Sequence, residues 1–195
     1  MGRLAEEGIK QFGVSAFGEA TKPELLGAIC LGLRIPHAVV FCNTESACKF
    51  LATRLRRENL SALVLPGMPP DERADAIDQF VSYDVNILVT TGAWPQDLPV
   101  ESAEVVYMYD FPESSDSYVK QIGECDKPGV REALVITFVR DFQDSWRERL
   151  EAECCTRIEP LPEHITGLYR RCFPIVVTPA AWNSIQKLAK KHGLL

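Results

Sequence analysis

The stretch His37-Ala-Val-Val-Phe-Cys42 decides the fold, because it is a continuous apolar run with the length of one strand. A strand without alternating polar residues is buried on both faces, which is typical of the interior of a parallel sheet. A helical pattern follows over residues 46–58, where Cys48, Leu51 and Leu55 share one face. This order of strand and helix predicts one unit of an α/β fold.

The same alternation of apolar runs and helical patterns extends on both sides of this unit. Strands are predicted at residues 8–16, 37–42, 61–65, 86–91, 104–110 and 133–139, and helices at residues 23–33, 46–58, 71–81, 114–123 and 141–155. Because crossovers between parallel strands are right-handed, the loops after the strands lie along one edge of the sheet, where ligands usually bind. The predicted fold class is α/β, an open parallel sheet with helices on both faces, plus a C-terminal helical extension.

The C-terminal part of the chain departs from this pattern. Residues 1–157 are predicted to form the α/β domain, and residues 158–195 an irregular connection and a basic amphipathic helix. A Thr-Pro start and a glycine stop bound this helix over Thr178–Gly193. Residues 164–195 hold five basic and no acidic residues, so with a chain net charge of −6 the rest carries −11. We expect the tail either to fold onto this acidic body or to bind an acidic partner.

The composition excludes several classes of protein. The 195-residue chain has 46 % apolar and 25 % charged residues, ordinary values for a soluble domain with a sizeable core. No apolar run approaches the roughly 20 residues of a membrane span, and the N-terminus lacks a signal-peptide layout. The seven cysteines contain no Cys-x-x-Cys pair and the three histidines are scattered, so no metal site is expected. We expect an intracellular chain without membrane contact, cytoplasmic in preference to nuclear.

Motifs of self-contained enzymes are missing from the sequence. There is no phosphate-binding Gly-x-x-x-x-Gly-Lys-Ser/Thr loop, no nucleophile elbow and no His-Glu-x-x-His. The segment Asp71-Glu-Arg-Ala-Asp75 has the letters of an acidic magnesium box, but it follows Pro-Pro and opens a helix instead of ending a buried strand. No catalytic residue is therefore assigned to this chain.

An ordered series of short segments stands at the predicted strand ends. In chain order they are Gly8-Ile-Lys-Gln-Phe12, Val39-Val-Phe-Cys-Asn-Thr44, Leu65-Pro-Gly67 with Glu72-Arg73, Ile87-Leu-Val-Thr-Thr91 with Leu98-Pro-Val100, and Tyr109-Asp-Phe-Pro112 with Ile122-Gly123. Over about residues 8–169 this series resembles the C-terminal RecA-like lobe of a DEAD-box RNA helicase. The segment 157–169 is similar to the end of the Dhh-one/DDX-six branch, with the initiation factor four-A branch a close second.

The resemblance implies a surface for the RNA backbone. In that family this lobe grips RNA through loop hydroxyls, backbone amides at helix starts and an arginine, the groups that sequence-independent phosphate binding requires. The matching positions in this chain are Asn43, Thr44, Gly67, Arg73, Thr90 and Thr91. Each of them alone also fits ordinary turn or cap chemistry, and Thr44 fits a helix N-cap.

The nucleotide-facing positions that the resemblance implies are altered. The family has alanine-arginine-glycine-leucine-aspartate where this chain has Pro95-Gln96-Asp97-Leu98-Pro99. Two later arginines of the family are replaced by Glu124 and Lys127. An arginine finger is worth roughly 10³–10⁵ in rate, and the segment from residue 97 to residue 126 carries eight acids and one base. The altered positions are Gln96, Pro99, Glu124 and Lys127, and ATP with magnesium is expected only through a first lobe.

Three functions remain open at this point. The first is a degenerate, ATPase-deficient helicase lobe that binds RNA weakly and acts with protein partners in an RNA–protein assembly. The second is the divergent second lobe of an active ATP-dependent RNA helicase, whose first lobe lies outside this chain. The third is a protein-interaction domain without affinity for RNA.

Overall fold

The computed structural model describes residues 9–15, 22–33, 37–99, 102–122, 133–140 and 143–161 of the chain. In chain order the elements are β1 (Ile9–Ser15), α1 (Lys22–Leu33), β2 (Ala38–Phe41), α2 (Glu45–Arg57), β3 (Ala62–Val64), α3 (Pro70–Val81), β4 (Ile87–Thr90), β5 (Val105–Met108), α4 (Ser115–Ile122), β6 (Ala133–Val139), α5 (Asp144–Cys154) and β7 (Glu159–Pro160).

The seven strands form one parallel sheet in the order β3-β4-β2-β5-β6-β1-β7. β2 lies between β4 and β5, with Val40 beside Val89 on one side and Tyr107 on the other. All four residues of β2 are buried, so the strand needs no polar alternation. The apolar run around this strand therefore marks the middle of the described sheet.

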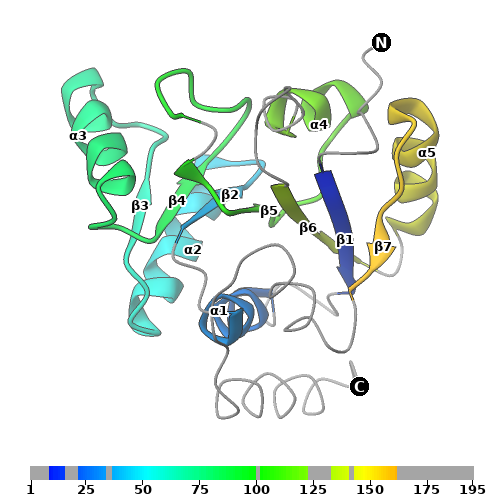
Figure 1. The fold of residues 1–195 in the computed structure, drawn as a ribbon, viewed down its shortest axis with the longest axis horizontal. Helices are drawn as coiled ribbons and strands as arrows, with labels where there is room; N and C mark the ends of the chain where they lie inside the picture. The colour runs from blue at the N-terminus through cyan, green and yellow to red at the C-terminus, as the bar shows by residue number, and fades with distance from the viewer. Residues whose placement is uncertain are drawn as a thin grey trace.

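Helices cover both faces of the sheet (Figure 1), with α1 and α2 on one face and α3, α4 and α5 on the other. Successive side chains of a strand point to opposite faces. Val40 accordingly belongs to the same core cluster as Leu51 of α2, whereas Val39 belongs to the cluster of Phe80 of α3. The apolar faces of the helices are thus buried against the two faces of one sheet.

The α/β class and the six strands of the sequence analysis are confirmed, but the structure adds a seventh strand. β7 is two exposed residues long and pairs with Phe12 and Gly13 of β1. The Leu161 N–H donates to the Gly13 carbonyl at 2.9 Å and extends this pairing. A two-residue strand ending in proline has no periodicity, which is why the pattern predicted an irregular connection there. The C-terminal helix over Thr178–Gly193 lies outside the described residues, and the division at residue 157 stays a prediction.

The described segments hold neither a helix that could cross a bilayer nor a cluster that could bind a metal ion. None of their helices combines the length and apolar character needed to cross a bilayer. Nor do these segments bring together three or more His, Cys, Asp or Glu side chains in a way that could hold a metal ion. The cysteines in the same segments are free thiols, at positions 30, 42, 48, 154 and 155.

His37 is a buried titratable group at the start of β2. Its ring stacks between Phe80, at a centroid distance of 4.6 Å, and Tyr83, at 3.8 Å. Nδ1 lies 3.1 Å from the Ser102 carbonyl oxygen, which requires the proton on Nδ1, while Nε2 is buried without a partner in the described part of the chain. Burial therefore lowers the pKa of His37 and keeps the ring neutral.

We predict that His37 makes the fold less stable in mild acid. Because the folded pKa is lowered, the unfolded chain takes up the proton first, and stability falls as the pH drops below about 6.5, by at most about 1.4 kcal/mol per pH unit. His37→Phe keeps a ring between Phe80 and Tyr83 but cannot be protonated. Urea unfolding at several pH values should give a flatter stability curve for this variant, and parallel curves for both proteins would contradict the prediction.

Candidate nucleic-acid interface

The positions expected to contact RNA lie at one edge of the sheet. β3, β4 and β2 are adjacent and parallel, so their carboxyl ends meet at that edge. Asn43 and Thr44 follow β2, Gly67 follows β3, and Thr91 follows β4. Arg73 lies in the first turn of α3, which begins soon after Gly67. Residues that are up to 48 positions apart in the sequence, from 43 to 91, are thereby brought together. This is the arrangement expected where the carboxyl ends of parallel strands meet.

The loop after β2 is held by hydrogen bonds to the neighbouring strands. The Cys42 N–H donates to the Thr90 carbonyl at 3.0 Å, and the Asn43 N–H donates to Asp110 Oδ2 at 3.0 Å. The Asn43 side-chain amide also donates to the Phe111 carbonyl at 3.0 Å. Thr44 is the N-cap of α2, with Oγ1 accepting from the Ala47 N–H at 3.1 Å. Its hydroxyl proton remains available to donate to a phosphate oxygen.

A thiol pair fills the space behind this loop. Cys42 and Cys48 are both buried, and Cys48 Sγ lies 3.5 Å from the Thr90 carbonyl oxygen. A hydrogen bond with Cys48, together with burial, raises the pKa of the Cys42 thiol. The Cys42 thiol therefore stays protonated and serves as an apolar filler of the core.

Gly67 occupies a position that only glycine suits. Its φ of +79° lies in the left-handed region, and a Cβ there would stand 2.7 Å from Oε1 of Glu45. Glu45 is in turn paired with Lys49, with 2.5 Å between Oε1 and Nζ. The lack of a side chain at Gly67 therefore lets this turn lie close to the start of α2. The exposed backbone of Gly67 is not covered by a side chain.

Arg73 is half-buried, and its N–H donates to the Pro69 carbonyl at 2.9 Å, which closes the first turn of α3. No ion pair engages its guanidinium within the described segments. Asp71 and Glu72 lie exposed in the same turn. Within the described residues the Arg73 guanidinium is therefore available to bind an oxyanion.

The two threonines after β4 have different surroundings. Thr90 is 3 % exposed and its Oγ1 donates to the Thr91 carbonyl at 3.4 Å, while its own carbonyl accepts from Cys42. Thr91 is half-buried at the rim of the edge. The Thr90 hydroxyl therefore makes a hydrogen bond within the chain. Of the two threonines, Thr91 is the one whose hydroxyl can reach a ligand.

The sequence analysis missed the ion pair beneath this edge. Lys22, at the start of α1, is 2 % exposed and its Nζ lies 2.9 Å from Asp110 Oδ1. The same ammonium stands 4.4 Å from the centroid of the Tyr109 ring. Asp110 thus joins α1 through one oxygen and Asn43 through the other. No local pattern marks Lys22, because its partner is 88 residues away in the chain.

The loop after β4 carries Gln96 and Pro99, two of the four positions expected to face a nucleotide. Gln96 and Pro99 are exposed, whereas Trp94 is buried. The indole N–H of Trp94 donates to the Leu98 carbonyl at 2.9 Å, and its backbone N–H donates to the Lys120 carbonyl at 3.1 Å. The indole therefore fixes the loop, a role that sequence reasoning did not give it. Glu124 and Lys127 lie outside the described residues.

A pocket of about 370 Å³ opens between the ends of β2 and β4 and helix α4. One acidic and one basic side chain contribute to its walls, so it has no marked charge. The lining residues are Cys42, Asn43, Gly92, Ala93, Glu113, Ser117, Lys120 and Gln121. A pocket without excess positive charge gives a triphosphate no electrostatic attraction.

Comparisons with known proteins agree with this geometry. Residues 21–128 match the family described as helicase conserved C-terminal domain. The ATP-dependent RNA helicase eIF4A of Meyerozyma guilliermondii is 30 % identical over 167 residues, which are 85 % of this chain and 42 % of that protein. The C-terminal domain of Saccharomyces cerevisiae Dbp5, solved with Gle1 and IP6, has a TM-score of 0.73 at 19 % identity and covers 86 % of this chain and 100 % of its own.

A second structure of S. cerevisiae Dbp5, bound to RNA and ADP BeF3, also has a TM-score of 0.73 at 22 % identity, covering 84 % of this chain and 45 % of that one. The family match spans more than half of the chain. This protein therefore belongs to the helicase conserved C-terminal domain family, as a C-terminal lobe of the DEAD-box type. The chain spans less than half the length of the eIF4A protein that it matches.

We predict that Lys22→Met weakens the fold. The substitution removes one partner of a largely buried ion pair and leaves Asp110 uncompensated, which typically costs about 3–5 kcal/mol. Asp110 is 17 % exposed, so the loss in unfolding free energy should fall at the lower end of that range. Lys22→Met with Asp110→Asn should recover part of the loss in urea unfolding. A single variant as stable as the wild type would show that the pair does not support the fold.

Proposed function

We propose that this lobe binds the RNA backbone weakly and without sequence preference, and that the chain alone binds ATP poorly and does not hydrolyse it. The observation that carries the proposal is the convergence of six expected RNA positions on one sheet edge. Phosphate-binding chemistry is available there from the Thr91 hydroxyl, the Thr44 hydroxyl and the Arg73 guanidinium. A structure of S. cerevisiae Dbp5 with the same fold was solved bound to RNA and ADP BeF3, which supports RNA as the kind of ligand.

The absence of sequence preference follows from the kinds of group at the edge. Hydroxyls, backbone N–H groups and one arginine recognise phosphate, which is the same at every nucleotide. A single lobe offers few such contacts, so its affinity should be that of non-specific binding, roughly 10⁻⁴–10⁻⁶ M at physiological salt. This affinity suits a lobe that acts beside protein partners or a first RecA-like lobe in an RNA–protein assembly. An intracellular, cytoplasmic site of action is part of the proposal.

The lack of ATPase activity rests on the altered nucleotide side. Exposed Gln96 and Pro99 stand where the family has an arginine and an aspartate, and Glu124 and Lys127 replace two further arginines. A lysine keeps the charge at position 127 but not the bidentate fork of arginine. The described part of this region includes exposed Asp97, Glu113 and Asp116, which repel a triphosphate.

We predict that Arg73→Ala lowers the affinity for RNA to a similar extent for every sequence. Loss of one phosphate contact should also reduce the slope of log affinity against log salt by about 0.7, because fewer counterions are released. Fluorescence anisotropy with labelled single-stranded oligouridine and a mixed-sequence RNA, at several salt concentrations, measures both effects.

The matched control for this measurement is Arg57→Ala. It removes the same charge at the far end of α2, about 20 Å along the helix from Thr44, and should leave RNA binding unchanged. An equal loss in both variants would mean that only net charge matters. No detectable binding by the wild type at low salt would favour a pure protein-interaction domain instead.

For the nucleotide side we predict no ATP turnover by the 195-residue chain, with or without RNA, and no stabilisation by ATP with magnesium in thermal unfolding. A ligand that binds the folded state at a hundred times its Kd stabilises by about 2.7 kcal/mol, which such a measurement detects easily. RNA-stimulated phosphate release that Glu124→Ala abolishes would show that the altered side is active.

A further inference from the structure

Helix α2 presents an unusual surface on the side that faces away from the core. Its buried side consists of Cys48, Leu51, Ala52 and Leu55. Phe50, Arg54 and Arg57 follow the spacing i, i+4, i+7 and form one exposed stripe, which we call the α2 stripe. Phe50 is 48 % exposed, and the Arg54 guanidinium stands 5.3 Å from the centroid of its ring. Neither Arg54 nor Arg57 has an ion-pair partner among the described residues.

Helix α3 presents the opposite charge. Asp71, Asp75, Asp78 and Val81 are exposed at the spacing i, i+4, i+7, i+10 and form the α3 stripe. Val81 is 38 % exposed, and its neighbours along the stripe are acidic. The three aspartates of the stripe make no ion pair with any other described residue.

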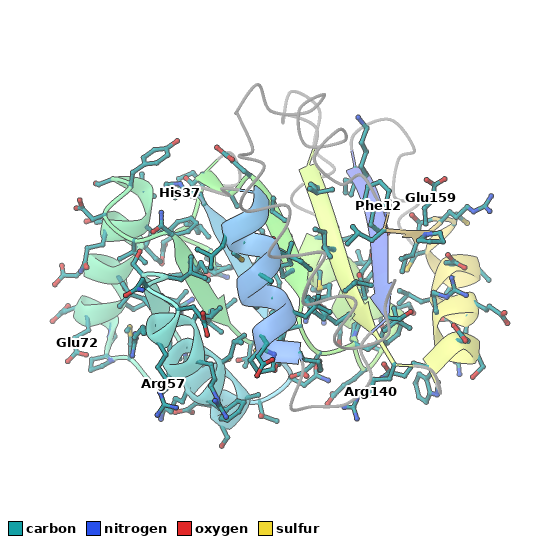
Figure 2. All side chains as sticks on the ribbon, turned by 90° about the horizontal axis from the view of Figure 1, so that it is seen from below. Phe12, His37, Arg57, Glu72, Arg140 and Glu159 are labelled. Carbon is teal, nitrogen blue, oxygen red and sulfur yellow. The ribbon has the colours of Figure 1, made fainter. Side chains whose placement is uncertain are left out.

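The two stripes cannot meet within one molecule. The buried side of α2 packs on the sheet face of Val40, and the buried side of α3, including Phe80, packs on the face of Val39. Helices α2 and α3 therefore lie on opposite faces of the sheet, at the end where β3 lies (Figure 1). The stripes on their exposed sides point away from the sheet in opposite directions. In Figure 2 the labelled Arg57 of α2 and Glu72 of α3 both extend outward at the left-hand side. Contact between the stripes requires two copies of the chain.

One antiparallel register matches the stripes in both charge and apolarity. With Phe50 opposite Val81, Arg54 comes within one residue of Asp78 and Arg57 within one residue of Asp75, because both helices rise about 1.5 Å per residue and long arginine side chains span that offset. A parallel arrangement that pairs Arg54 with Asp75 places Phe50 against Asp71. The Asp71 carboxylate would then be desolvated without a partner, which is unfavourable. Only the antiparallel register of these two joins aromatic to aliphatic and each arginine to an aspartate.

From this complementarity we propose that the chain associates with itself, the α2 stripe of one copy docking on the α3 stripe of the next. The contact is heterologous, since two different surfaces meet, and each copy keeps one stripe of each kind free for a further neighbour. One helix pair buries far less than the area of about 1,200 Å² below which interfaces are typically transient. The association is accordingly weak, concentration-dependent and sensitive to salt.

Sedimentation velocity of the 195-residue chain over a range of concentrations tests the proposal. At about 0.01 M ionic strength, where the Debye length is about 30 Å, the mean sedimentation coefficient should rise with concentration. At about 1 M, where that length is about 3 Å, the rise should disappear. A sedimentation coefficient that does not depend on concentration at low salt overturns the proposal.

Charge-reversal variants distinguish specific docking of the two stripes from a general effect of net charge on association. R54E with R57E makes both stripes of one variant acidic, and D75K with D78K makes both stripes of the other basic, so each alone should sediment as a monomer. Mixed in equal amounts, the two variants should associate at least as strongly as the wild type, because every contact between them pairs opposite charges. Failure of the mixture to associate, with circular dichroism showing both variants folded, overturns the proposal.

A matched control changes the same charge elsewhere. K120E with R157E alters the net charge as much as R54E with R57E, but at exposed positions on α4 and after α5, and should keep the wild-type association. Loss of association in this control would assign the effect to net charge and overturn the proposal. If R54E with R57E lowers RNA affinity and leaves sedimentation unchanged, the α2 stripe is a nucleic-acid contact instead.

Discussion

The ion pair between Lys22 and Asp110 is the constraint on which the candidate interface depends. An ammonium and a carboxylate withdrawn from water cost several kcal/mol each unless their geometry compensates them. Here Nζ lies 2.9 Å from Oδ1, and the Tyr109 ring supports the ammonium from another side. Because the second oxygen of Asp110 holds the Asn43 N–H, the pair fixes where β2 ends relative to β5 and α1. The placement of Thr44 at the start of α2 follows from that.

The order of strands and helices was predictable from the sequence because it depends on local pattern. The run around β2 is apolar since β2 has neighbours on both sides and helices on both faces, and the lack of polar alternation in the run indicates this burial directly. β7 was not predictable, because its pairing with Phe12 and Gly13 is set by the fold and not by its own two residues. Lys22 escaped prediction for the same reason, since its partner becomes a neighbour only after folding.

The candidate site shows a similar division. Strand-end positions could be named from sequence because parallel strands bring their carboxyl ends to one edge. Which side chain faces outward at that edge could not, and Thr90 turns its hydroxyl to the Thr91 carbonyl while Thr91 lies at the rim. The role of Trp94 was equally unpredictable, because only the folded chain places the Leu98 carbonyl at its indole N–H and the Lys120 carbonyl at its backbone N–H.

The positions expected to contact RNA and those expected to face a nucleotide differ in how strongly the fold depends on their residues. Gly67 has a left-handed backbone conformation with Glu45 close to where a Cβ would stand, so substitution there strains the sheet edge. Thr90 is buried at the end of β4, where it pairs with Phe41 of β2. Gln96 and Pro99 are exposed, and the loop that carries them is fixed by Trp94. Surface positions of this kind change at little cost in stability. The requirements of folding therefore hold the geometry of the candidate RNA-binding edge more tightly than they hold the residues exposed on the loop after β4.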